Sequence, residues 1–144
     1  MNPNEKLDAA IQLAAKHHSG QLDKSGVPYI CHVMVVICRV DTVLLKTIAA
    51  LHDIVEDTDV TALQIENTFG SKIADAVTAI TKIEGEDYNE YLERVKKNEY
   101  ARVVKLADLS HNMDLRRLND EPSEKDISRR AKYDKAMKYL SGVQ

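Results

Sequence analysis

The chain has 144 residues, of which 44% are hydrophobic and 30% are charged, a composition typical of globular domains and not of disordered chains. With one Phe and no Trp, the core must consist mainly of aliphatic side chains, which favours packed helices. The net charge of −3 gives no positive field for nucleic acid or an anionic membrane, so we expect neither as a partner.

The first predicted helix begins after Asn2 and continues to a loop at residues 21–29, which contains glycine and proline breakers. Its apolar residues follow the spacing of one helical face: Leu7, Ala10, Ile11, Ala14 and Ala15. The apolar segment 29–40 is rich in β-branched residues, and its period alone does not distinguish a helix from a strand. Because no neighbouring segment offers a strand to pair with it, we interpret it as a buried helix.

A third helix is predicted from Thr42 through Val55, where apolar residues recur three or four positions apart. Thr61 and Gln64 form a capping-box pattern for a short helix that ends near Gly70. The pattern therefore predicts two helices with a short acidic connection between them.

Four further helices complete the chain, and no repeat or linker divides them. They are predicted from Ser71, after a loop within 83–98, over 99–118, and from Ser123 to about Leu140. The helix within 83–98 is rich in charge, and we expect it to be an exposed, solvated helix and not a lid or an interaction surface. The sequence thus predicts an all-α helical bundle that forms one domain over residues 1–144.

The N-terminal stretch lacks the apolar segment of a signal peptide, and no apolar run approaches the ~20 residues of a membrane span. Cys31 and Cys38 are seven positions apart, about 10 Å along a helix, which is too far for a disulfide. Two free thiols fit a reducing compartment. We therefore expect a cytoplasmic protein.

Charged side chains interrupt the apolar pattern at several points. His52 and Asp53 lie beside Leu51 and Ile54, and buried charges are costly unless they are paired, hydrogen-bonded or bound to a metal. His32 and Asp108 are likewise flanked by apolar residues. Taken singly, each has a plainer explanation, as a satisfied core histidine or as an ion-pair partner. Together, two imidazoles and two carboxylates from different helices suit Mn²⁺ or Fe²⁺, with Zn²⁺ as an alternative.

Helical spacing adds candidate catalytic residues to this set. Glu56 lies four residues after His52, and Asn112 lies four residues after Asp108, so each shares a face with a candidate ligand. A carboxylate and an amide can serve as base and donor for a water molecule at a metal. The alternative is that Glu56 and Asp57 belong to a solvated acidic turn. Acidic residues are unfavourable at a helix C-terminus, which counts against that alternative.

Four segments, PYICH, LHDIVEDTDVT, FG and KLADLSHNMDL, occur in an order that resembles the hydrolase domain of the RelA/SpoT family and its single-domain relatives, the small alarmone hydrolases. These proteins belong to the HD phosphohydrolase superfamily, and the resemblance covers most of the chain. It implies an all-α bundle and Mn²⁺-dependent hydrolysis of (p)ppGpp to GDP or GTP and pyrophosphate. The expected partner is therefore a small-molecule nucleotide.

The resemblance also implies roles for individual residues. The positions that match the family's metal ligands are His32, His52, Asp53 and Asp108. Those that match its catalytic residues are Glu56, Asp57 and Asn112. Lys24 and Tyr29 match the family's nucleotide pocket. We add Ser25 and Lys105 as candidate substrate-binding residues, and Lys105 is equally well explained as the ion-pair partner of Asp108.

Three positions depart from the family pattern. Asp23 replaces an Arg before Lys24 that packs on guanine, which removes a stacking cation and adds an anion beside phosphate. Asp114 and Leu115 replace an Arg and a Thr, and Val33 replaces a Pro. The metal-binding and hydrolytic residues are therefore retained, whereas the base-reading residues are not. The alternatives are hydrolysis of another nucleotide phosphate, such as NADPH, and a metal- and nucleotide-binding regulatory module without turnover.

Overall fold

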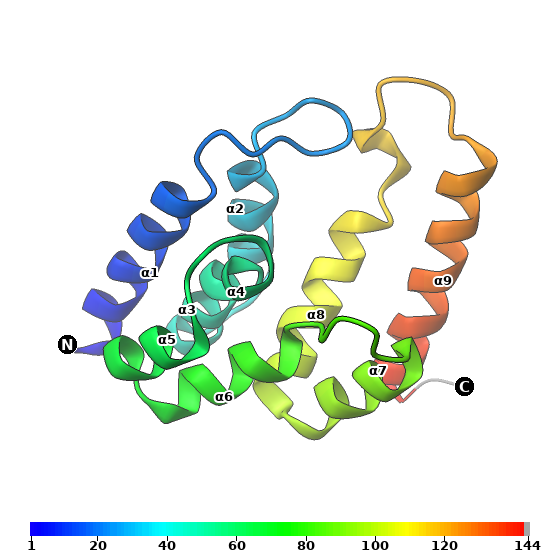
Figure 1. The fold of residues 1–144 in the computed structure, drawn as a ribbon. Helices are drawn as coiled ribbons and strands as arrows, with labels where there is room; N and C mark the ends of the chain where they lie inside the picture. Colours follow the sequence, from blue (N-terminus) through cyan, green and yellow to red (C-terminus); the bar gives the residue numbers. More distant parts are fainter. Residues whose placement is uncertain (143–144) are drawn as a thin grey trace.

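The computed structural model describes residues 1–142, which form helices joined by short loops (Figure 1). In chain order they are α1 (Pro3–His17), α2 (Ile30–Cys38), α3 (Val43–Leu51), α4 (Ile54–Asp57), α5 (Ala62–Phe69), α6 (Ser71–Ile80), α7 (Tyr88–Lys97), α8 (Glu99–Asn112), the 3₁₀ turn η1 (Leu115–Arg117) and α9 (Glu124–Ser141). Extended pairing within these residues is limited to an isolated bridge between Leu22 and Pro28. The all-α prediction is confirmed. The last two residues of the predicted 1–144 domain lie outside the described residues.

Side-chain caps explain where several helices begin. At the start of α5, Thr61 and Gln64 bond reciprocally to each other's backbone, and Ser123 and Asp126 do the same at the start of α9. The side chain of Asn2 caps α1 by accepting a backbone hydrogen bond. Each of these caps stands where the sequence predicts a helix start.

The helix predicted from Thr42 to Val55 is interrupted at His52 and Asp53. The Nδ1 of His52 donates a hydrogen bond of 2.6 Å to the carbonyl of Ala49. That carbonyl is the acceptor that an uninterrupted helix would give to the N–H of Asp53. The prediction of one continuous helix is therefore wrong, because the histidine ring competes for the helical hydrogen bond. The break leaves α3 and α4 on either side of a turn that carries both polar residues.

The helix predicted over residues 99–118 is also shorter than expected. It ends at Asn112, and the side chain of Asp114 then accepts a hydrogen bond from the N–H of Arg116. A short acidic side chain that bonds to nearby backbone offers an alternative to the helical ladder. The chain therefore leaves the helix, forms η1 and lies at the surface beside the loop at 21–29.

The helix predicted within 83–98 is not exposed on all sides. On α7, Tyr91, Leu92 and Val95 are buried, and the helix packs against α6, α8 and α9. Glu90, Glu93 and Lys97 are exposed, as the solvated-face interpretation expects, whereas Arg94 is half-buried and pairs with Glu86. The prediction failed to identify this buried stripe because three apolar residues are few among so many charges.

The core surrounds α3, which packs against α1, α2, α6 and α8. It contributes Ile48 and Leu51, whose side chains are fully buried, and each such side chain stabilises the fold by about 1.5–3 kcal/mol. Figure 1 shows α8 between this group and α9, which packs on α8 and α7. Among the described helices, none combines the length and the apolar character needed to cross a membrane.

Candidate metal centre and active site

Four side chains from α2, the α3–α4 turn and α8 converge in the interior. His32, His52, Asp53 and Asp108 each offer one ligand atom, and these atoms all lie within 4.8 Å of one another. The Nε2 of His32 is 2.8 Å from Oδ1 of Asp108, and the Nε2 of His52 is 2.9 Å from Oδ2 of Asp53. The structure thus brings together all four predicted metal ligands, which we call the His/Asp cluster.

Hydrogen bonds behind the two rings determine which nitrogen faces the cluster. The Nδ1 of His52 donates to the carbonyl of Ala49, which leaves Nε2 for the cluster. The Nδ1 of His32 lies 2.7 Å from Nδ1 of His111, and the two rings stack with centroids 5.0 Å apart. With Nε2 of His32 available to a cation, its Nδ1–H donates to His111.

His111 is not among the residues predicted from the sequence. Its position three residues after Asp108 places it on the same face of α8, and this spacing is the signal that could have identified it. Burial, reinforced by the charges of Arg117 and Arg39, lowers the pKa of His111 to about 4. The ring is therefore neutral at physiological pH and can accept the proton of its neighbour.

The charges in the His/Asp cluster favour a cation. Burial alone would lower the pKa of His52, but the carboxylates of Asp53 and Asp108 outweigh it and raise that pKa well above its usual value. Burial would likewise raise the pKa of Asp108, yet Lys105 and the two histidines hold it well below its usual value. The negative charge that attracts a proton to His52 also attracts a divalent cation, which competes with that proton. The donor set of two imidazoles and two carboxylates therefore fits a divalent metal ion.

The three predicted catalytic residues line a cavity of about 140 Å³ beside the cluster: Glu56, Asp57 and Asn112. An oxygen of Glu56 accepts the backbone N–H of Lys82 at 2.9 Å, and the amide of Asn112 donates to Asp108 at 3.2 Å. Burial of its carboxyl group, together with the neighbouring carboxylates, raises the pKa of Asp57 to about 6. A carboxylate in this pKa range is suited to proton transfer near neutral pH.

Two predicted substrate-binding residues contact the cluster itself. The hydroxyl of Tyr29 donates to Asp53, and Nζ of Lys105 lies 2.9 Å from Oδ2 of Asp108. Both residues also line the small cavity. In the structure Lys105 forms an ion pair with Asp108. Because Lys105 also lines the cavity, a phosphate contact stays an alternative role for it.

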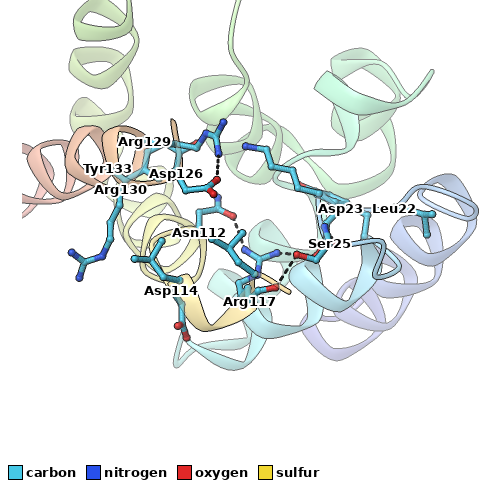
Figure 2. Close-up of a pocket in the computed structure, with 14 residues that line it drawn as sticks. Leu22, Asp23, Ser25, Asn112, Asp114, Arg117, Asp126, Arg129, Arg130 and Tyr133 are labelled. Carbon is cyan, nitrogen blue, oxygen red and sulfur yellow. Dashed lines mark hydrogen bonds and ion pairs between the residues drawn. The ribbon is translucent and has the colours of Figure 1, made fainter. Parts of the chain in front are cut away.

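Figure 2 shows a second cavity, which has a volume of about 320 Å³ and shares lining residues with the first. We call it the outer cavity, and it lies between the loop at 21–29, the segment after α8, and α9. Its lining includes the predicted residues Lys24, Ser25 and Tyr29. Because Tyr29, Asn112 and Tyr133 line both cavities, the outer cavity lies directly beside the cavity at the cluster. Its volume is in the range of small-molecule sites.

Helix α9 contributes residues to the outer cavity that the sequence does not reveal. Arg129, Arg130 and Tyr133 line it, and they lie more than ninety positions after the loop at 21–29. Arg129 pairs with Asp126 on its own helix at 3.3 Å. Nothing in the charge pattern of α9 distinguishes these arginines from a solvated helical face, so only the packing of α9 identifies them.

Known proteins share this sequence pattern and this fold. Residues 10–134 match the family model described as HD domain. The bifunctional (p)ppGpp synthase/hydrolase SpoT of Escherichia coli strain K12 is 31% identical over 124 residues, which cover 76% of this chain and 18% of that protein. A GTP pyrophosphokinase of Streptomyces coelicolor is 35% identical over 138 residues, or 83% of this chain and 16% of that protein. The chain therefore spans less than a fifth of the length of these curated relatives.

A solved structure, described as a metazoan ortholog of SpoT that hydrolyzes ppGpp, has the same fold. It aligns with a TM-score of 0.78 and 25% sequence identity, over 97% of this chain and 87% of the other. The resemblance to RelA/SpoT hydrolases is thus confirmed, and the matched family segment contains every residue of the His/Asp cluster. The chain belongs to the HD domain family.

Proposed function

We propose that this protein is a metal-dependent phosphohydrolase whose leading substrate is (p)ppGpp, from which it releases pyrophosphate and GDP or GTP. The observation that carries the proposal is the buried His/Asp cluster, which has carboxylates at its rim and opens toward a cavity of nucleotide size. The relatives named for (p)ppGpp hydrolysis and the solved structure support the same substrate. We further propose that the chain acts as a single HD-type domain on a small-molecule nucleotide.

His32, His52, Asp53 and Asp108 are the residues that would hold the divalent ion. We propose Mn²⁺, with Fe²⁺ and Zn²⁺ as alternatives, because the set mixes nitrogen and oxygen donors. When bound, the ion supplies Lewis-acid polarisation of phosphate and acidifies a water molecule. The hydrogen bonds to Ala49 and His111 hold the two imidazole rings in the orientation that this requires.

Glu56 is the proposed general base. It is exposed at the cavity rim, and one of its oxygens is held by the N–H of Lys82, so the other can face a water molecule. The water oxygen forms a bond to the phosphorus attached to the 3′ oxygen, and the bond between that phosphorus and the 3′ oxygen breaks. Glu56 takes one proton from the water, the departing 3′ oxygen gains one proton from solvent and leaves as the free 3′ hydroxyl, and Asp57 and Asn112 orient the reactants.

The proposal is tested by measuring pyrophosphate or phosphate release with Mn²⁺ from ppGpp, pppGpp, NADPH and GDP. We expect ppGpp and pppGpp to react fastest. Glu56→Gln keeps the size of the side chain but removes the base, so kcat should fall by about 10²–10⁴-fold with metal content unchanged. The exposed Glu84 gives a matched control, since Glu84→Gln should leave kcat unaltered.

Other results would assign other functions. Faster turnover of NADPH than of ppGpp would remove (p)ppGpp as the leading substrate while keeping the hydrolase. Full activity in the Glu56→Gln variant would refute the role of that residue. Binding of nucleotide without any release of product would support the regulatory module instead.

A further inference from the structure

Arg117 lies in the wall of the outer cavity, between Asn112 at the end of α8 and the loop at 21–29 (Figure 2). Its Nη1 donates to Oδ1 of Asn112 at 2.9 Å, and its Nη2 lies 3.3 Å from Oδ2 of Asp23. Its backbone carbonyl accepts a hydrogen bond of 2.8 Å from the hydroxyl of Ser25. Arg117 therefore joins the loop at 21–29 to the residue that contacts the His/Asp cluster.

The carboxylate of Asp23 is engaged by the protein on both oxygens. Oδ1 accepts the backbone N–H groups of Ser25 at 2.8 Å and of Val27 at 3.0 Å, and Oδ2 faces Arg117. Burial would raise the pKa of Asp23, but these two backbone hydrogen bonds and Arg117 outweigh it and lower that pKa. Asp23 therefore stays ionised, and its charge is balanced by its partner. The repulsion toward phosphate that the sequence suggests is largely cancelled.

The contacts of Arg117 use the edges of its guanidinium group. Hydrogen bonds to a guanidinium lie in its plane, so Asn112 and Asp23 occupy edges of the group and fix the orientation of that plane. What remains for a ligand is the flat face, which stacks well on aromatic rings. Arg117 lines the cavity with 23% of its side chain exposed, so part of the side chain is accessible to a ligand there.

Other cations in the outer cavity are better placed to neutralise phosphate. The ammonium group of Lys24 makes no ion pair within residues 1–142, and the guanidinium of Arg129 pairs only with Asp126 on the half-exposed surface of α9. Figure 2 shows Arg129 on the opposite side of the cavity from Asp23 and Ser25. The charges that suit phosphate and the flat surface that suits a base are therefore on different elements.

We propose that Arg117 reads the nucleobase by stacking and that Asp23 is a positioning residue that holds the guanidinium plane. This inference rests on the proposed function only for the placement of a nucleotide in the outer cavity. Because stacking recognises the ring face and not its hydrogen-bonding edge, purines bind better than pyrimidines, and guanine and adenine bind alike. The ligand class of the outer cavity is therefore the purine nucleoside diphosphates.

Calorimetric titration of the purified, metal-containing protein with GDP, ADP, UDP and pyrophosphate tests the inference without turnover of a 3′-diphosphate. The wild type should bind GDP and ADP within about threefold of each other and UDP about tenfold more weakly. Arg117→Lys keeps the charge and removes the plane, so it should weaken GDP and ADP about tenfold and pyrophosphate less than twofold. The matched control is Arg116→Lys, because Arg116 is 90% exposed and pairs only with Asp114.

A second variant keeps the test decisive if Arg117→Lys is poorly folded. Asp23→Asn retains an oxygen for the two backbone hydrogen bonds and removes the charge that faces Arg117. It should weaken GDP about threefold, and the double variant should be no weaker than Arg117→Lys alone, as expected for coupled residues.

Three outcomes would overturn the inference. They are equal weakening of GDP and pyrophosphate by Arg117→Lys, unchanged GDP affinity in both variants, and a wild type that binds UDP as tightly as GDP. The first of these would make Arg117 a phosphate contact. Purine-selective binding that depends on Arg117, in a protein that hydrolyses none of the tested nucleotides, would uphold the inference and remove only the proposed function.

Discussion

The His/Asp cluster and the outer cavity share a wall, yet they are built differently. In the cluster, His32 and His52 are each 2% exposed and Asp108 is 3% exposed, and each has at least two polar partners. The outer cavity is walled by a loop, by η1 and by half-buried or exposed residues of α9. Buried polar groups must find partners, and the cluster meets this demand within the core. The proposed chemistry thus depends on buried core residues, and the proposed ligand selectivity depends on the more exposed residues of the outer cavity.

This difference separates two kinds of variant. A substitution in the cluster disturbs buried charges, so it should reduce metal binding and stability together. A substitution in the outer cavity, such as Arg117→Lys, should change ligand affinity and reduce stability less than a substitution in the cluster does. Variants that fail to follow this division would show that the two regions are coupled more closely than their burial suggests.

The largest effect is expected for Asp108→Asn. This change removes the charge that both imidazoles and Lys105 face, so stoichiometric metal binding and hydrolysis should both be lost. It also leaves a buried ammonium group without its partner, which should lower the free energy of unfolding by about 3 kcal/mol. Metal analysis and urea unfolding measure the two effects.

Asp134 provides the matched control for this variant, because it pairs with Lys138 on the surface of α9. Asp134→Asn should leave the metal content unchanged and alter stability by less than about 0.5 kcal/mol. If the Asp108→Asn protein still holds one metal ion per chain, Asp108 is not required as a metal ligand, and the proposed four-residue metal site is wrong.

A smaller effect is expected from His111, which contacts the proposed metal ligand His32 but is not itself one of the four proposed ligands. His111→Ala removes the acceptor behind His32, and loss of such a partner typically weakens metal affinity about 10–100-fold. Competition with a chromophoric chelator measures this affinity directly. His111→Asn restores an acceptor and should recover part of the loss. If both variants bind metal as tightly as the wild type, the ring does not orient His32.

The contrast between core and periphery also explains what the sequence could predict. His52, Asp53 and Asp108 are recognisable because a charge among apolar neighbours breaks a regular pattern. Glu56 and Asn112 follow from the spacing of one helical face. These signals lie within short stretches of sequence, so the candidate residues can be identified before it is known that the fold brings them together.

Apart from His111, whose spacing from Asp108 is a local signal, the residues that the sequence did not reveal depend on long-range packing. Arg129 and Tyr133 reach the outer cavity only because α9 folds back on α8, and Arg117 meets Asp23 across more than ninety positions. The helix break at His52 depends on a side-chain hydrogen bond to Ala49 that competes with the helix, and periodicity does not register such competition. The residues of the outer cavity are therefore harder to predict from the sequence than those of the cluster, because they come from segments far apart in the chain.

The smallest effect concerns Asp57, at the border between the two regions. In the metal-free protein the pKa of Asp57 is about 6, above its ordinary value of 3.8, because of burial and the nearby carboxylates. Between these pH values the folded state binds more protons than the unfolded state, so stability falls as pH rises from about 4 to 6. Asp57→Asn should therefore raise the Tm by about 2 °C at pH 7.5, and the two proteins should converge below pH 4.

Thermal unfolding in excess chelator measures this difference, and the exposed Asp59 supplies the control. Asp59→Asn should change the Tm at pH 7.5 by less than the Asp57 variant does, because its position lies outside the cavity wall. Added metal should shrink the gain from Asp57→Asn, since a cation offsets the repulsion among the carboxylates. A gain that persists unchanged below pH 4 would come from packing and not from charge. The charge of Asp57 would then have little effect on stability, as for a residue of the outer cavity, and repulsion among the buried carboxylates would not extend beyond Asp53.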